Sequence, residues 1–260
     1  MKIDFVLTAC NLNNHYLSLY PYVVRIWKEK FNLDCHLVLI SDEIPDFLKI
    51  YADKIILFKP IDGINTIFIA QVIRILYPCL YDNKNILITD VDIFPISYKY
   101  FIGQIENFPD NNNIFVSYRD SYLKQNMLSI CYNLANSGTW QDIFNIKNID
   151  DITKKIKDWY DPKYDGKKNC PGWFTDQKNL YQYVMLWKVN NPQKLIILKD
   201  NNTKFNRLDK RQRKYIVSNF SKVLEDIKNG VYSDYHSIKP YTKFRNLTIQ
   251  LTDTICKINC

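Results

Sequence analysis

Short apolar runs alternate with helical patterns through the N-terminal part of the chain. Each run is rich in β-branched residues and too short for a buried helix, which predicts a strand. The segments between the runs place apolar residues at helical spacing. The predicted strands span residues 3–8, 35–40, 54–58 and 86–88, and the predicted helices span residues 17–31, 46–51 and 65–76. This alternation predicts an α/β fold whose central, mostly parallel sheet is flanked by helices.

The second half of the chain is less regular. Its predicted strands span residues 114–118, 129–134 and 195–198, and its predicted helices span residues 149–160, 175–187 and 221–229. A loop with Gly and Pro covers residues 161–172, and Thr175 is placed to cap the helix that follows. The length favours one domain over residues 1–240, with halves at 1–95 and 96–240 and a helical tail at 241–260.

Two aspartates follow the predicted strand at residues 86–88. Asp90 and Asp92 lie where a parallel strand ends, which is where open sheets bind their ligands. If the chain stays extended, their spacing puts both carboxylates on one side, where they need a cation or hydrogen-bond donors. A divalent metal that carries phosphates meets this need. The alternative is a strand-end turn with solvated carboxylates.

The chain carries a net charge of +8, from 35 basic and 27 acidic residues. This charge is compatible with phosphate-bearing substrates or with peripheral association at an anionic membrane surface. The basic residues are spread along the chain, and we do not expect nucleic acid as a partner. Their densest cluster lies at residues 210–214, and we interpret it as a solvated helix face rather than a partner site.

The cysteines and the N-terminus predict where the protein resides. Seven cysteines, an odd number without metal-finger spacing, indicate a reduced, intracellular protein. The first four residues place an acid where a secretory signal needs apolar residues, and no apolar run reaches the ~18 residues of a membrane span. We therefore predict a cytoplasmic protein.

Five short motifs appear in the order in which one enzyme family carries them. They are Thr-Ala-Cys-Asn at 8–11, Arg-Ile-Leu-Tyr-Pro at 74–78, Leu-Ile-Thr-Asp-Val-Asp at 87–92, Trp-Phe-Thr-Asp-Gln at 173–177 and His-Ser-Ile-Lys-Pro-Tyr at 236–241. With these motifs the sequence resembles GT-A-fold glycosyltransferases with an Asp-x-Asp motif. It is similar to glycogenin-like and lipopolysaccharide galactosyltransferase-like enzymes, and to small nucleotide-sugar transferases of large DNA viruses and bacteria. The resemblance implies that residues 1–95 bind a nucleotide sugar and that residues 96–240 face its acceptor.

The resemblance also implies a divalent metal, Mn²⁺ or Mg²⁺, at Asp90, Asp92 and His236. Asp92 and His236 are implied as direct ligands, and Asp90 as a residue that acts through ribose or water. A mixed set of carboxylate and imidazole ligands suits Mn²⁺. Lys239 is implied on the diphosphate, although this chain lacks the family's glycine between the histidine and the lysine and has a shorter spacer.

Further residues are implied around the nucleotide. Thr8, Ala9 and Asn11 fall at the base and ribose, because the first strand-to-helix turn faces the ligand crevice. Asp42 is a candidate to accept a hydrogen bond from uracil or ribose, and a turn or capping role is the alternative. Arg74 is implied to contact phosphate or to position Asp90, and a surface arginine on an amphipathic helix is the alternative.

On the acceptor side, Asp176 and Gln177 match the family's Asp-Gln pair. Asp176 is a candidate general base on an acceptor hydroxyl, and a helix-capping role is the alternative. The family's sugar-holding asparagine corresponds either to Asn133 or to Asn136. The aromatic candidates for stacking on a sugar, with core packing as the alternative, are Trp140, Trp173 and Phe174.

Together these features predict a metal-dependent glycosyltransferase with a UDP-sugar donor and a glycan, lipid-linked or protein acceptor. In a viral setting it would act in the host cytoplasm. Asp176 as a base suits inversion of the anomeric centre, whereas the glycogenin-like resemblance favours retention. The alternatives are a non-catalytic nucleotide-sugar-binding or scaffold protein on the same fold and a haloacid dehalogenase-type phosphatase. The phosphatase is disfavoured because three predicted strands precede the aspartates.

Overall fold

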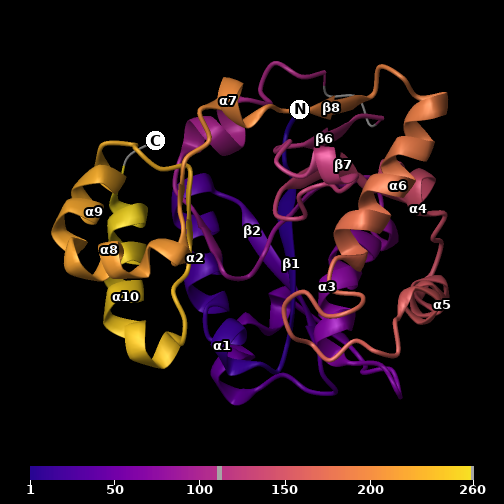
Figure 1. Ribbon diagram of the computed structural model, residues 1–260, viewed down its shortest axis with the longest axis horizontal. Coiled ribbons are helices and arrows are strands. Elements are labelled where there is room, and N and C mark those ends of the chain that lie inside the picture. The colour runs from indigo at the N-terminus through magenta and orange to yellow at the C-terminus, as the bar shows by residue number, and fades with distance from the viewer. Residues whose placement is uncertain (110–112, 259–260) are drawn as a thin grey trace.

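A mostly parallel sheet forms the centre of the protein (Figure 1). The computed structural model describes residues 1–109 and 113–258. Within these residues the sheet has seven strands in the order β3-β2-β1-β4-β7-β6-β8. Their bounds are Phe5–Asn11 (β1), Asp34–Ile40 (β2), Ile55–Phe58 (β3), Asn85–Ile88 (β4), Phe115–Ser117 (β6), Asn133–Asn136 (β7) and Leu195–Ile197 (β8). Only β7 runs antiparallel to its neighbours in this sheet, so the predicted fold class is confirmed.

A small second sheet lies beyond the end of β4. It consists of β5 (Ile93–Pro95), β10 (Asp234–His236) and β9 (Arg207–Leu208). Strand β10 runs antiparallel to β5 and parallel to β9. Its register sets His236 opposite Ile93, one residue after Asp92. This pairing brings the C-terminal histidine to the aspartates that follow β4.

Helices cover both faces of the central sheet (Figure 1). They are α1 (Asn14–Leu17), α2 (Tyr20–Phe31), α3 (Thr66–Leu76), α4 (Ser137–Phe144), α5 (Ile149–Trp159), α6 (Thr175–Asn190), α7 (Asp200–Thr203), α8 (Arg213–Ser218), α9 (Phe220–Lys228) and α10 (Tyr241–Lys257). Side chains alternate along a strand, so Val6 packs into one core while Phe5 and Leu7 pack into the other. The first core includes α2 and α8–α10, and the second includes α3–α6.

Local sequence explains several helix ends. Asn65 begins α3 by accepting a hydrogen bond from the Ile67 amide at 2.9 Å. Asn148 and Asp151 form a capping box at the start of α5. Pro21 lies in the first turn of α2, where its missing N–H costs nothing. The predicted helix over 17–31 corresponds to α2 at Tyr20–Phe31, and its first residue, Leu17, ends α1.

Three local predictions are wrong. Residues 8–11 are not a turn, because β1 continues to Asn11 and pairs with β2 along its whole length. The strand predicted over 129–134 is β7 at Asn133–Asn136. Thr175 is not the N-cap of α6: Phe174 occupies that position without a side-chain bond, and Thr175 is the first helical residue.

The predicted tail forms α10, which packs against α2 and α9. Residues 259–260 of that tail lie outside the described residues, and the predicted division into a domain and a tail remains a prediction. Six cysteines in the described part of the chain are free thiols. Across residues 1–109 and 113–258, no helix is both long enough and apolar enough to cross a bilayer.

Candidate functional site

The two aspartates after β4 turn to different partners. The Thr89 amide still donates to the Leu7 carbonyl of β1 at 2.9 Å, so the sheet extends to this point. The chain then turns, and the Ile93 amide donates to the Asp90 carbonyl at 3.3 Å. The carboxylate of Asp90 pairs with Arg74. Asp92 instead faces the small sheet, so the two carboxylates do not share one partner.

Asp92 is the centre of a cluster of cationic and imidazole groups. Its Oδ2 lies 3.0 Å from Nε2 of His236, 2.6 Å from Nζ of Lys239 and 3.7 Å from Nζ of Lys210. Burial disfavours the charged form of Asp92, but attraction to Lys239, His236 and Lys210 outweighs it and holds the pKa of Asp92 well below its usual range. Asp92 is therefore a carboxylate at neutral pH.

A further carboxylate stands behind the imidazole. Asp209 Oδ2 lies 3.9 Å from Nδ1 of His236, on the ring edge opposite Asp92. The interaction with His236, assisted by hydrogen bonds from Arg211, lowers the pKa of Asp209. A carboxylate at one ring nitrogen fixes the orientation of an imidazole whose other nitrogen faces a ligand. No sequence signal pointed to Asp209, because its role depends on the pairing of β9 with β10.

Arg74 joins Asp90 to Asp176. One terminal nitrogen contacts Asp90, and Nη2 donates to Oδ2 of Asp176 at 3.3 Å. Asp176 is only 3% exposed, and burial raises its pKa although Arg74 acts in the opposite direction. The Oδ1 atom of Asp176 accepts a hydrogen bond from the backbone N–H of Gln177 at 2.8 Å. Arg74 is buried and holds two carboxylates, so the surface-arginine alternative is wrong.

A cavity of about 420 Å³ opens between these groups, at the carboxyl ends of β1 and β4. Its lining includes nine of the residues proposed from the sequence: Ala9, Asn11, Arg74, Asp90, Asp92, Trp173, Asp176, Gln177 and His236. Gln177 Oε1 is buried and has no hydrogen-bond partner among the described residues. An amide oxygen in that state is available to a hydroxyl of a bound molecule.

The other proposed residues lie away from the lining. Thr8 is fully buried within β1, and Asp42 is exposed beyond β2. Asn133 is buried and donates from Nδ2 to the Ser129 carbonyl at 2.8 Å. Its alternative, Asn136, caps α4 through the Gly138 amide. Lys239 reaches Asp92 from outside the cavity lining, with its Nζ 3.0 Å from the centre of the Tyr16 ring.

Two of the three proposed metal ligands, Asp92 and His236, are placed to bind one divalent cation. Asp92 and His236 face the same cavity and lie close enough to share one ion, and a carboxylate with an imidazole suits Mn²⁺. Asp90 is held on Arg74 instead. In the described parts of the chain, no group of three or more His, Cys, Asp or Glu side chains is arranged so that it could hold a metal ion. A bound cation would therefore need oxygen ligands from its substrate or from water.

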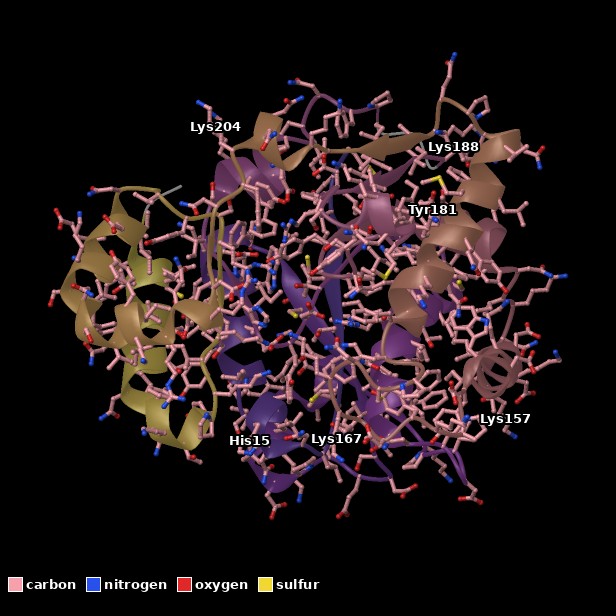
Figure 2. The ribbon with its side chains drawn as sticks, in the orientation of Figure 1. His15, Lys157, Lys167, Tyr181, Lys188 and Lys204 are labelled. Atoms are coloured by element: carbon pink, nitrogen blue, oxygen red, sulfur yellow. The ribbon has the colours of Figure 1, made fainter. Side chains whose placement is uncertain are left out.

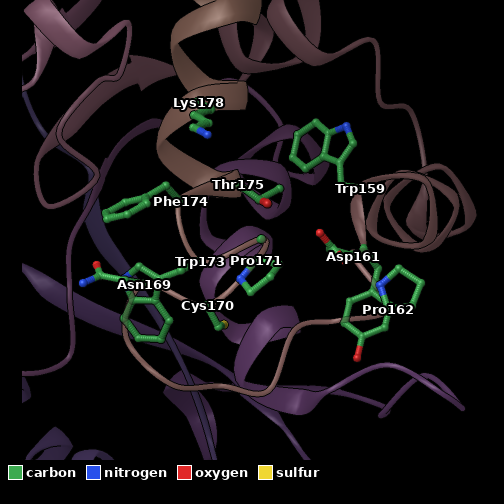
Figure 3. A pocket seen from close by; sticks show the side chains of 12 residues that line it. Trp159, Asp161, Pro162, Asn169, Cys170, Pro171, Trp173, Phe174, Thr175 and Lys178 are labelled. Atoms are coloured by element: carbon green, nitrogen blue, oxygen red, sulfur yellow. The ribbon is translucent and has the colours of Figure 1, made fainter.

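A second, more open cavity of about 790 Å³ lies over the loop before α6 (Figure 3). Partly exposed aromatic side chains, including Trp159, Trp173 and Phe174, border it. Trp173 also lines the first cavity, so the two adjoin there. Trp140 is fully buried against Phe115 and Phe144, so it packs in the core and cannot stack on a sugar.

The positive charge is dispersed over the outside of the protein. The exposed lysines labelled in Figure 2, Lys157, Lys167, Lys188 and Lys204, lie in separate parts of the molecule. Lys210 departs from the prediction for its cluster, because it lines the cavity beside Asp92 rather than a solvated face. Arg119 and Arg207, which the sequence analysis did not single out, also line this cavity.

Comparison with known proteins identifies the fold. No protein-family model and no curated protein sequence matches the chain. The glycosyltransferase GlyE of Streptococcus pneumoniae TIGR4 matches 98% of this chain and 62% of its own, at 14% identity and a TM-score of 0.53. Its apo form matches over the same shares with a TM-score of 0.50. The galactosyltransferase LgtC, in complex with donor and acceptor sugar analogues, matches 98% of this chain and 96% of its own at 14% identity and a TM-score of 0.49.

The similarity to GlyE and the sheet order define the fold class. The chain has the GT-A fold, an α/β fold with a mostly parallel central sheet. Its similarity to GlyE extends over nearly the whole chain but over only 62% of GlyE itself.

Proposed function

We propose that the protein is a metal-dependent glycosyltransferase that takes its sugar from a nucleotide diphosphate sugar, with uridine as the nucleoside. The observation that carries this proposal is the cavity at the carboxyl ends of β1 and β4 of a GT-A sheet. There Asp92 meets His236 and two lysines, and Arg74 links Asp90 to a buried Asp176. Ligands bind at this edge of open parallel sheets.

The nucleotide side of the cavity would be the edge formed by Ala9 and Asn11. Lys210 and Lys239 would place ammonium groups beside the diphosphate, where charge-assisted hydrogen bonds are strong. A divalent ion on Asp92 and His236 would add electrostatic stabilisation of the departing diphosphate. Asp209 would keep the His236 ring oriented toward the ligand. We propose Thr8, Asp42 and Asn133 as supporting residues only, because they do not line the cavity.

Asp176 and Gln177 would act on the sugar side. In an inverting transfer, the acceptor hydroxyl oxygen bonds to the anomeric carbon, the bond to the diphosphate breaks, and the hydroxyl proton passes to the Asp176 carboxylate. Burial raises the pKa of Asp176, which makes its carboxylate a better base than an exposed one. Gln177 Oε1, free of partners in the described part of the chain, would accept a hydrogen bond from a sugar hydroxyl.

A panel of nucleotide sugars, assayed for hydrolysis with Mn²⁺ and without an acceptor, tests this proposal. We expect one UDP-sugar to be consumed, with the product anomer distinguishing inversion from retention. The Asp92→Ala and His236→Ala variants should lose this turnover, whereas Asp253→Ala, which removes an exposed ion pair with Arg25, should retain it. Binding of a UDP-sugar without turnover would instead indicate a non-catalytic nucleotide-sugar-binding protein.

A further inference from the structure

Two arginines form part of the cavity wall. Arg119 follows β6, and Arg207 lies on β9. The side chains of both are 14% exposed, and both line the cavity. We refer to Arg119 and Arg207 together as the arginine wall. Nothing in the proposed donor chemistry uses these two residues.

Each guanidinium forms a two-point ion pair with one carboxylate. Asp200 accepts from Nε of Arg119 at 3.2 Å and from Nη2 at 2.7 Å, and the guanidinium carbon lies 3.8 Å over the Phe205 ring. Asp234, which is fully buried, accepts from Nε of Arg207 at 2.8 Å and from Nη2 at 2.6 Å. Arginine positioned in this way loses little side-chain entropy when it binds a ligand.

In the described part of the chain, each guanidinium has one terminal nitrogen that forms none of these hydrogen bonds. In the described residues, Nη1 of Arg119 and Nη1 of Arg207 have no recorded hydrogen-bond partner. A guanidinium has five N–H donors, so each can still donate to an oxygen inside the cavity. Tyr122 and Ser129 line the same cavity. Buried ion pairs are weak contributors to stability, so fold stabilisation alone does not account for two such pairs opening onto one cavity.

The two arginines come from segments other than the one that carries Asp90 and Asp92: Arg119 follows β6, and Arg207 on β9 pairs across the small sheet with Asp234. Strand β6 is parallel to β4 and separated from it by β7, so their carboxyl ends share one sheet edge at a spacing of ~10 Å. The chain after β6 carries Arg119. The loop before β7 is tied to the start of α6, because the Leu128 amide donates to the Gln177 carbonyl at 3.2 Å. Lys210 and Lys239, by contrast, lie on Asp92.

We propose that Arg119 and Arg207 bind an anionic substituent, a carboxylate, phosphate or sulfate, on the sugar that accepts the transfer. This inference rests on the proposed glycosyltransferase function. Guanidinium groups match such oxyanions through paired, charge-assisted hydrogen bonds. The acceptor hydroxyl would then lie between the arginine wall and Asp176.

Calorimetry with matched sugars tests the proposal without any variant. The charged probes are methyl glucuronide, glucose 6-phosphate and glucose 6-sulfate, and the neutral probe is methyl glucoside. Each is titrated into the protein alone and into the protein saturated with UDP and Mn²⁺. At least one charged probe should bind tenfold or more tightly than the neutral probe in both settings. Equal affinities for all four probes would overturn the proposal.

Variants then locate the binding. Arg119→Lys and Arg207→Lys keep the positive charge but lose the fixed guanidinium geometry, so affinity for the charged probe should fall at least tenfold. Affinity for methyl glucoside and for UDP with Mn²⁺ should not change. Arg25→Lys, on an exposed ion pair, should leave every affinity unchanged.

The titrations with UDP and those with the charged sugars test the proposed function and the acceptor proposal separately. Failure of the wild-type protein to bind UDP would count against the glycosyltransferase assignment, whatever the charged sugars do. Loss of UDP affinity in the arginine variants would place the arginine wall in the donor site and overturn the acceptor proposal. Variants that bind the charged probe as well as the wild type does would overturn it too.

Discussion

Arg74 is the side chain through which the two halves of the candidate site are coupled. It is buried on α3 and contacts Asp90 after β4 and Asp176 at the start of α6. Asp176 has a raised pKa because burial outweighs the attraction of Arg74. The protein therefore holds a carboxylate in an environment that disfavours its charge, which is a common property of catalytic acids and bases.

Substitution of Asp176 by Asn should separate chemistry from folding and from donor binding. The amide keeps the size of the side chain but cannot accept a proton, so transfer should fall by ~10²–10⁴-fold. Because burial disfavours the charged carboxylate, the neutral variant should melt no lower than the wild type at pH 7. Transfer rates, thermal unfolding and UDP affinity measure the three effects.

The matched control is Asp158→Asn, which changes an exposed carboxylate paired with Lys154 on α5. It should leave all three quantities near the wild-type values. An Asp176→Asn variant that transfers sugar at the full rate would remove Asp176 from the chemistry. Loss of UDP affinity in that variant would place Asp176 in the donor site.

The pH dependence of transfer should report the same carboxyl group. A general base acts only when deprotonated, so kcat/KM should decrease as the pH falls through the pKa of Asp176 in the free enzyme. Because that pKa is raised, the acid limb should lie above the ordinary aspartate value of ~3.9. The residual activity of Asp176→Asn should lack this limb. A limb that survives in the variant would belong to another group.

At the scale of elements, the small sheet brings the C-terminal histidine into the site. Strands β9 and β10 have two and three residues, which is too short for a hydrophobic period, so the sequence could not predict them. His236 itself was identified from its motif, and the pairing with β5 explains how it reaches Asp92. Asp209 and Arg207 depend on the same pairing and were therefore missed.

The strands with strong local signals were predictable. The predicted strands at 35–40 and 54–58 contain continuous apolar runs, at 37–40 and 55–58, with turn signals beside them, and they correspond closely to β2 and β3. The segment 8–11 is predicted to be a turn because it follows the first predicted strand, but the ladder with β2 keeps it extended. Arg119 could have been suspected, since it follows a predicted strand at the edge where Asp90 lies.

Helix α5 offers a test of an element that stands apart from the chemistry. Its capping box satisfies backbone amides of the first turn, with Asn148 Oδ1 accepting from Asp150 and Asp151. Asn148→Ala should therefore lower the free energy of unfolding by ~1 kcal/mol. For a protein of this size the melting temperature should fall by ~2–4 °C.

Transfer and UDP affinity should be unchanged in Asn148→Ala, because α5 does not line the first cavity. Asn201→Ala, which changes an exposed side chain in α7, serves as the control. A loss of activity in the Asn148 variant would mean that α5 supports the site through α3, against which it packs.

At the scale of the whole molecule, the two candidate ligands come from distant parts of the chain, 144 residues apart. Asp92 follows the fourth strand, whereas His236 is close to the C-terminus, so their meeting requires most of the fold. Lys210, Lys239 and His236 surround Asp92, and they stabilise its negative charge without a metal. A cation that binds here must compete with them, so a diphosphate that draws the lysines away should help it to bind.

This competition predicts that the metal and the nucleotide stabilise the fold together. A ligand that binds only the native state stabilises it by RT ln(1 + [L]/Kd), or ~2.7 kcal/mol at 100 times Kd. With ~2–4 °C per kcal/mol, UDP with Mn²⁺ should raise the melting temperature by ~5–10 °C. Either ligand alone should raise it by less than half as much, and a chelator should abolish the joint increase. The joint increase should also disappear in His236→Ala but persist in Asp253→Ala, whose carboxylate is paired at the surface. Additive shifts from the two ligands would show that they bind independently, and the shared site at Asp92 and His236 would then be wrong.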